Sequence, residues 1–165
     1  MKDESTFWND LKSGKFVSMI KECSRGQSVN SSKEMYNIMK PMFAETDDIE
    51  MFYGVFLDSH NRILAIEKLF QGSIMSASIY PREVIKRVLT LKATAMVAVH
   101  NHPAGDTKPS PEDKTVTVHL WVALRSIEVS LHDHIIIGDF YHSMADEGFM
   151  DSVKNRFSSF MNNSF

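Results

Sequence analysis

The chain has 165 residues, of which 43% are hydrophobic and 24% charged, as expected for one ordinary globular domain. Its formal net charge of −3 excludes an overall basic field that would attract nucleic-acid backbones. Cys23 is the only cysteine, which excludes an intramolecular disulfide and a zinc site built from several thiolates. No segment approaches the roughly 20 consecutive apolar residues of a membrane span, and the acidic N-terminus is unlike a secretory signal. We therefore expect a cytoplasmic protein with no membrane partner.

Residues 1–45 are predicted to form a helical N-terminal extension. Apolar residues recur there at helical spacing, with an interruption at Gly14. Ser31 and Glu34 form an S-x-x-E capping box before a second helix, and Pro41 marks the end of that helix or a kink in it.

Residues 46–150 are predicted to form the core domain. Residues 51–58 and 62–70 are rich in aromatic and β-branched side chains and flank a Ser-His-Asn turn, which predicts an antiparallel hairpin. Pro81 begins a helix, and the wholly apolar residues 95–99 predict a buried central strand. We then expect a helix from Ser110, strands over 129–137 and 141–144, and a C-terminal helix or tail over 151–165. This element order predicts an α/β fold in which helices flank a mixed sheet.

A His-x-His pair directly follows the predicted central strand. Since His100 and His102 are two residues apart, their side chains point to the same side and could take adjacent corners of a tetrahedral zinc ion. The ten-residue loop before Asp113 is long enough to fold back and bring a carboxylate as the third ligand. Three protein ligands leave the fourth position to water, as in catalytic zinc sites. The spacing therefore predicts a Zn²⁺ site at these three residues.

Two further residues are candidates for catalysis. Zinc lowers the pKa of bound water to about 7, and a hydrolase needs a nearby carboxylate to take up and return the proton. Glu67 is the candidate general acid/base, and Ser110 could donate a hydrogen bond to the developing oxyanion. Simpler interpretations exist. The two histidines could satisfy local hydrogen bonds, Glu67 could be a charged residue on a strand, and Ser110 with Asp113 could be an ordinary helix start.

Several separated motifs resemble a known family. His100-x-His102 and Asp113, with Pro103 and Ser110 between them, resemble the JAMM motif of MPN+ domains, which are zinc-dependent isopeptidases with prokaryotic relatives. The resemblance is closer to the RadC-like branch of that family and covers roughly residues 45–150. It rests on residues 67–72 (EKLFQG), 81–84 (PREV), 100–105 (HNHPAG) and 133–138 (DHIIIG).

The resemblance implies a JAB/MPN-like, cytidine-deaminase-like mixed sheet flanked by helices. It implies a metallopeptidase or isopeptidase with a peptide or protein substrate, in which zinc is held by the His-x-His pair and Asp113. It implies the same roles for Glu67 and Ser110 as those proposed above. For Asp133 and His134 we expect a structural role, although His134 could instead be a buried residue that contacts a zinc ligand without binding the zinc itself.

Two alternative functions remain open. One is a RadC-like binding module with little or no turnover in DNA-associated or mobile-element processes. Net charge does not favour DNA association, and residues 1–45 show no clear glycine-hairpin version of the DNA-associated helical unit common in RadC-like proteins. The other is a metal-dependent nuclease, which is less favoured because only one carboxylate ligand is evident. The apolar helical termini are compatible with a homodimer, and residues 72–80 and 138–148 are candidate specificity segments.

Overall fold

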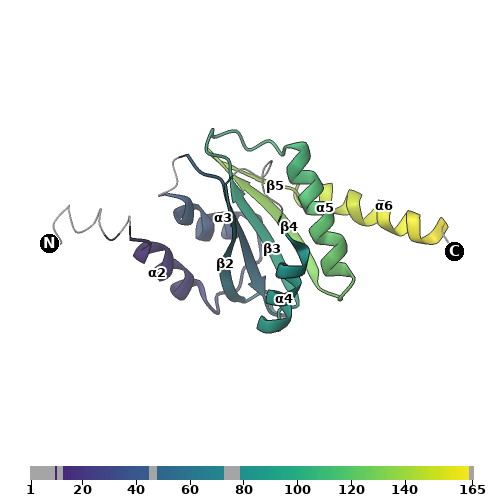
Figure 1. Ribbon diagram of the computed structural model, residues 1–165, viewed down its shortest axis with the longest axis horizontal. Helices are drawn as coiled ribbons and strands as arrows, with labels where there is room; N and C mark the ends of the chain where they lie inside the picture. The colour runs from purple at the N-terminus through teal and green to yellow at the C-terminus, as the bar shows by residue number, and fades with distance from the viewer. Residues whose placement is uncertain (1–9, 11–12, 45–47, 73–78, 164–165) are drawn as a thin grey trace.

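A computed structural model describes residues 10, 13–44, 48–72 and 79–163 and places one mixed sheet between two layers of helices (Figure 1). The strands are β1 (Met51–Leu57), β2 (Ile63–Gln71), β3 (Ala95–Asn101), β4 (Ser130–Ile137) and β5 (Tyr141–Ser143). They lie in the order β2-β1-β3-β4-β5, so that the apolar strand β3 is central as predicted. The pair β3/β4 is parallel and the other pairs are antiparallel, which gives the expected JAB/MPN-like mixed sheet.

Helices of the N-terminal part cover one face of the sheet. They are α2 (Lys15–Ser24), α3 (Ser32–Met39) and the 3₁₀ helix η1 (Lys40–Phe43). The hydroxyl of Ser31 accepts a hydrogen bond from the Glu34 N–H and caps α3, and Pro41 lies just after the end of that helix, as predicted. Their apolar side chains pack with Tyr53, Val55 and Val99 of the sheet. The predictions for residues 1–9 fall outside the described residues.

The other face of the sheet is covered by α4 (Pro81–Leu91), α5 (Pro111–Arg125) and α6 (Phe149–Asn163). Strand side chains alternate between the two faces, so Phe52, Met96 and Ile136 belong to this second core. Figure 1 shows α2 and α3 on one side of the sheet and α5 and α6 on the other.

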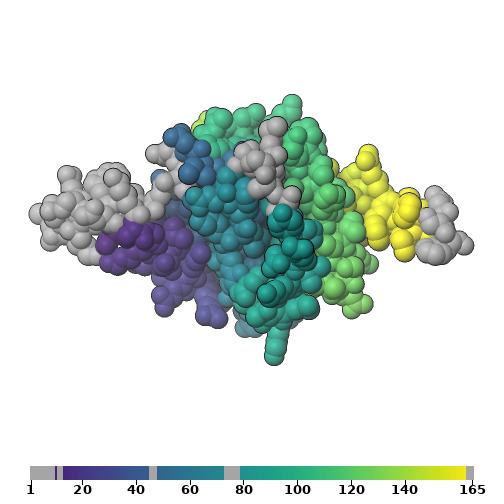
Figure 2. Space-filling model, viewed as in Figure 1, coloured from purple at the N-terminus to yellow at the C-terminus, as the bar shows by residue number. Residues whose placement is uncertain are grey.

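Helix α6 projects from the body of the molecule in the space-filling view (Figure 2). It packs on α5 through the rings of Phe157 and Trp121, whose centroids are 5.3 Å apart. Within the described part of the chain, no helix has the length and apolar character needed to cross a bilayer. The domain boundaries predicted at residues 45 and 150 remain predictions.

Candidate metal centre

The site begins where β3 ends. His100 is the sixth residue of this seven-residue strand and pairs with Phe52 of β1, whose ring stacks on the imidazole at 5.8 Å. Both side chains therefore lie on the face covered by α5. His102 follows the strand, and its N–H donates to the Ile137 carbonyl at the end of β4. The pairing of β3 with its two neighbours thus holds the His-x-His pair at the carboxyl end of the central strand.

Asp113 reaches the histidines from the first turn of α5. Ser110 caps this helix: its hydroxyl accepts the Asp113 N–H at 3.0 Å, while Asp113 Oδ2 accepts the Ser110 N–H at 2.8 Å. The helix-start interpretation is therefore confirmed, and the same capping box orients the carboxylate toward the imidazoles. The bond from the Asp113 N–H uses Ser110 Oγ as an acceptor only and leaves its hydroxyl proton available.

Three side chains with potential ligand atoms converge at this point. His100 Nε2 lies 2.9 Å from His102 Nε2 and 3.1 Å from Asp113 Oδ1, and His102 Nε2 lies 3.3 Å from Asp113 Oδ2. Ligands at zinc–ligand distances of about 2.0–2.1 Å in a tetrahedron would stand about 3.3 Å from one another. The spacing of the donor atoms, two nitrogens and a carboxylate, therefore fits a single divalent cation. Without a cation or a proton between them, the two Nε2 lone pairs would face each other unfavourably.

The other nitrogen of each imidazole is already engaged. His102 Nδ1 lies 2.7 Å from the carbonyl oxygen of Asp106, which can only accept, so this nitrogen carries the proton. His100 Nδ1 lies 2.8 Å from Nε2 of His134. Metal-binding histidines commonly bind a partner through the second nitrogen in this way, which leaves Nε2 to face the ion.

Burial and hydrogen bonding set the charges at the centre. Burial lowers the pKa of His100, and the hydrogen bond that its protonated ring would donate to Asp113 opposes this only in part. The corresponding hydrogen bond from protonated His102 to Asp113 raises the pKa of His102. Burial by itself would raise the pKa of the Asp113 carboxyl, but its interactions with the protonated forms of both histidines hold that pKa well below its usual range. A buried carboxylate therefore stays ionised between two imidazoles, which favours a bound cation.

The structure does not bring Glu67 to this cluster. Both carboxylate oxygens of Glu67 accept hydrogen bonds from the guanidinium of Arg87 on α4, one of them from Nε at 2.7 Å. Glu67 pairs with Gly54 of β1, and Gly54 pairs with Ala98 of β3. Glu67 is thus separated from β3 by a whole strand. The role predicted for Glu67 from sequence has no support in this arrangement.

A different glutamate, Glu50, lies beside the histidines. Asn101 binds the chain around it, because its side-chain oxygen accepts the Met51 N–H at 2.7 Å and its amide nitrogen donates to the Ile49 carbonyl at 3.2 Å. The Glu50 charge adds to the larger effect of Asp113 in raising the pKa of His102. It also opposes the burial that lowers the pKa of His100. No sequence motif marks Glu50, since only the β1/β3 register reveals that it precedes the partner of His100 by two residues.

One cavity adjoins the candidate metal centre. It has a volume of about 450 Å³ and lies between η1, His102 and the turn after β4, with Phe43, Ile137 and Asp139 among its lining residues. Residues 138–139 of a predicted specificity segment therefore line a space beside the histidines. Of the other such segment, residues 73–78 lie outside the described residues.

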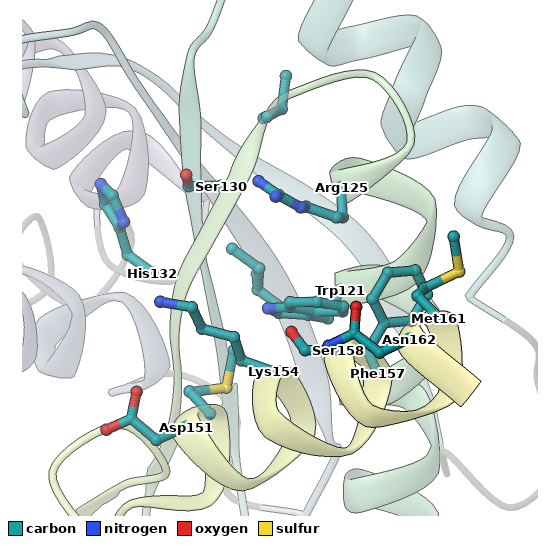
Figure 3. A pocket seen from close by; sticks show the side chains of 13 residues that line it. Trp121, Arg125, Ser130, His132, Asp151, Lys154, Phe157, Ser158, Met161 and Asn162 are labelled. Carbon is teal, nitrogen blue, oxygen red and sulfur yellow. The ribbon is translucent and has the colours of Figure 1, made fainter. Parts of the chain in front are cut away.

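A second cavity, of about 560 Å³, is lined by a different set of side chains (Figure 3). Its walls come from α5, β4 and α6, including Trp121, Arg125 and Lys154, and none of the three candidate ligands lines it. This cavity therefore shares no lining residue with the three candidate ligands.

Together, the fold and the site define a mixed α/β domain with a candidate metal centre at the carboxyl end of its central strand. The RadC-like JAB domain family matches residues 29–149, and the chain belongs to this family. The match begins within the segment predicted as an N-terminal extension, and so includes α3 and η1.

Several relatives share this region. The chain is 52% identical over 90 residues to a UPF0758 protein of Coxiella burnetii, a match that covers 54% of this chain and 40% of the relative. It is 43% identical over 101 residues to a UPF0758 protein of Vibrio cholerae, covering 61% and 64% of the two chains. A UPF0758 protein of Halorhodospira halophila is 37% identical over 118 residues, covering 72% and 52%. The chain thus spans between 40% and 64% of the length of these relatives.

Proposed function

We propose that this chain is a zinc-dependent hydrolase that cleaves an amide bond in a peptide or isopeptide. The observation that supports this most is the convergence of His100, His102 and Asp113, whose ligand atoms lie close enough together to share one cation. The partners of both Nδ1 atoms leave each Nε2 free for a cation. These three residues would hold zinc through the two Nε2 atoms and the carboxylate. Zinc held there would supply a Lewis acid and would lower the pKa of a water molecule that it binds.

In this proposal the general acid/base is Glu50 rather than Glu67. A carboxylate that shuttles a proton must come within hydrogen-bond reach of both the attacking water and the leaving amine. The chain around Glu50 is bound to Asn101, between the two histidines, whereas Glu67 is engaged by Arg87. Glu50 would take a proton from the attacking water and return it to the leaving amine.

Ser110 contributes a hydrogen-bond donor. As the N-cap of α5 its backbone is fixed next to Asp113, and its hydroxyl proton can be directed toward the substrate carbonyl. A donor fixed in advance stabilises the negative charge that develops on that oxygen. The peptide or protein substrate is proposed from the chemistry of the site and from family membership.

Elemental analysis tests the metal assignment. We expect one zinc per purified chain, and loss of that zinc in the double variant His100→Ala/His102→Ala. His119→Ala provides a matched control, because His119 lies on the exposed side of α5. We expect this variant to retain one zinc per chain. Stoichiometric zinc in the double variant would disprove the ligand assignment.

A pair of glutamate variants tests the catalytic assignment. On a panel of quenched peptides and lysine-linked isopeptides, we expect Glu50→Gln to lower kcat by roughly 100-fold or more while zinc is retained, since general acid–base catalysis typically contributes 10²–10⁴-fold. Glu67→Gln should change kcat far less. The opposite ranking would return the role to Glu67, and bound zinc without turnover on the whole panel would favour a non-catalytic module.

A further inference from the structure

A chain of buried hydrogen bonds extends from the candidate metal centre into the core. His100 Nδ1 lies 2.8 Å from His134 Nε2, and His134 Nδ1 lies 2.6 Å from the hydroxyl of Thr117 on α5. The Thr117 hydroxyl in turn donates to the main-chain carbonyl of Asp113 at 2.6 Å. The side chains of His100, His134 and Thr117 are all fully buried. The ring of Phe52 covers both imidazoles, with centroid distances of 5.8 and 5.2 Å.

His134 reaches this position because of an irregularity in the sheet. The parallel pairing of β3 with β4 shifts register between Met96 and Val97, so that one extra residue is accommodated in β4. Beyond the shift, His134 pairs with Ala98 and falls on the same face as His100. Strand side chains alternate with a period of two, so without the extra residue His134 would face the opposite core.

The direction of each hydrogen bond in the chain follows from its far end. The Asp113 carbonyl can only accept, so the Thr117 hydroxyl uses its single proton there; its other neighbour, the Met144 sulfur at 3.4 Å, is a much weaker acceptor. Thr117 Oγ1 must then accept from His134 Nδ1–H. In a neutral imidazole the other nitrogen is an acceptor, so His134 Nε2 accepts from His100 Nδ1–H. The proton of His100 is thereby confined to Nδ1, and its Nε2 presents a lone pair.

We infer that Thr117 and His134 are positioning residues that select the Nδ1-protonated tautomer of His100 and so prepare its Nε2 to bind the metal. The inference rests on the proposed metal site and extends it. Asp133 and His134, which are neighbours in sequence, then have two different roles. The carboxylate of Asp133 accepts hydrogen bonds from the N–H groups of His134 and Ala145 and from the hydroxyl of Ser143, which connects β4 to the end of β5 and to the residues after it. The His134 imidazole accepts the proton of His100 Nδ1 in a hydrogen bond and so orients a ligand of the proposed metal site.

The variant Thr117→Val tests the inference with almost no change in volume. Without the hydroxyl, a proton on His134 Nδ1 has no acceptor, so the proton moves to Nε2 and is donated to His100 Nδ1. The His100 proton must then reside on Nε2, where it blocks the metal. We expect zinc affinity, measured by competition with a chromophoric chelator, to fall roughly 10- to 100-fold, as for other partners of metal-binding histidines. Thr117→Ser should restore it.

Two further variants separate positioning from folding. Thr115→Val is a matched control, because Thr115 lies on the exposed side of the same helix and its hydroxyl donates to the Pro111 carbonyl at 2.9 Å in the same i to i−4 pattern. It should leave zinc affinity unchanged. His134→Phe keeps a ring in the core but removes the partner of His100, and should lower zinc affinity like Thr117→Val. Circular dichroism and denaturant unfolding would establish that every variant compared is folded.

A second readout requires neither metal nor activity. Long-range proton–nitrogen NMR correlations of the metal-free chain should show His100 protonated at Nδ1 in the wild type and at Nε2 in Thr117→Val. An unchanged His100 tautomer, or equal zinc affinity in Thr117→Val and wild type, would overturn the inference. If the wild-type chain bound no zinc at all, the proposed function would fail, while the tautomer spectra would still decide whether Thr117 and His134 act as inferred.

Discussion

At the scale of single residues, Gly138 allows the loop that follows His102 to approach the end of β4 closely. A Cβ atom at position 138 would lie only 2.2 Å from the carbonyl oxygen of Gly105. That same oxygen accepts the Asp139 N–H, and the Gly105 N–H donates to the His102 carbonyl. A side chain at position 138 would therefore clash with backbone atoms, which cannot move aside as the end of a flexible side chain can. These backbone atoms belong to the loop that follows His102.

We expect Gly138→Ala to displace this loop, to lower the free energy of unfolding by about 1–3 kcal/mol and to weaken zinc binding. Denaturant unfolding and zinc titration measure the two effects. In the matched variant Gly54→Ala, the new Cβ meets the ends of the Met96 and Leu69 side chains at 2.9 and 3.0 Å. That variant should lose stability and keep its zinc affinity. Full zinc affinity in Gly138→Ala would show that the contact with Gly105 does not position His102.

At the scale of elements, the hairpin of β1 and β2 depends on a carboxylate in its turn. Asp58 accepts hydrogen bonds from the N–H groups of Arg62 and His60, at 2.9 and 2.8 Å, and from the Arg62 guanidinium at 2.7 Å. The bond from the Arg62 N–H is foremost among the interactions that lower the pKa of Asp58 to about 2. These bonds favour the ionised form and close the turn, because they satisfy N–H groups that no strand partner reaches.

This lowered pKa makes the stability of the hairpin depend on pH. In the unfolded chain the Asp58 carboxyl titrates near its ordinary pKa of 3.8. Its stabilising contribution is therefore fully present above that pH and is lost as the pH falls through about 2. We expect Asp58→Ala to be less stable than wild type at pH 7 and the difference to shrink in acid, as measured by urea unfolding of metal-free protein. A difference that stays constant down to pH 2 would contradict this assignment.

At the scale of the whole molecule, the candidate metal centre brings together parts of the chain that are distant in sequence. His100 comes from β3, Asp113 from α5, His134 from β4, and Glu50 precedes β1. The unfolded chain does not hold these groups together. A ligand that binds only the folded form shifts the folding equilibrium toward that form.

Zinc should therefore stabilise the entire domain. At a free zinc concentration of 100 times Kd, we expect the free energy of unfolding to rise by about 2.7 kcal/mol. Urea unfolding in the presence of zinc or of a chelator measures this difference. Asp113→Asn should abolish most of it, because an amide is a poorer ligand than a carboxylate. An equal zinc effect in Asp113→Asn and wild type would place the bound metal elsewhere.

The sequence by itself determined the local features of this protein. The hairpin of β1 and β2, the apolar strand that leads into His100 and the cap at Ser110 were all predictable, because each depends on residues that are neighbours along the chain. The candidate ligands could be predicted for the same reason: His100 and His102 are two residues apart, and the cap at Ser110 places Asp113 in the first turn of α5.

Only the tertiary structure decided which other groups surround these ligands. The motif around Glu67 predicts a catalytic role, but α4 brings Arg87 to the Glu67 carboxylate. The antiparallel pairing of β1 with β3 instead brings Glu50 close enough to the histidines for its charge to act on both. Likewise, the extra residue in β4 turns His134 toward His100. Strand register and helix packing depend on contacts between residues that are tens of positions apart, and no local pattern of side chains specifies them.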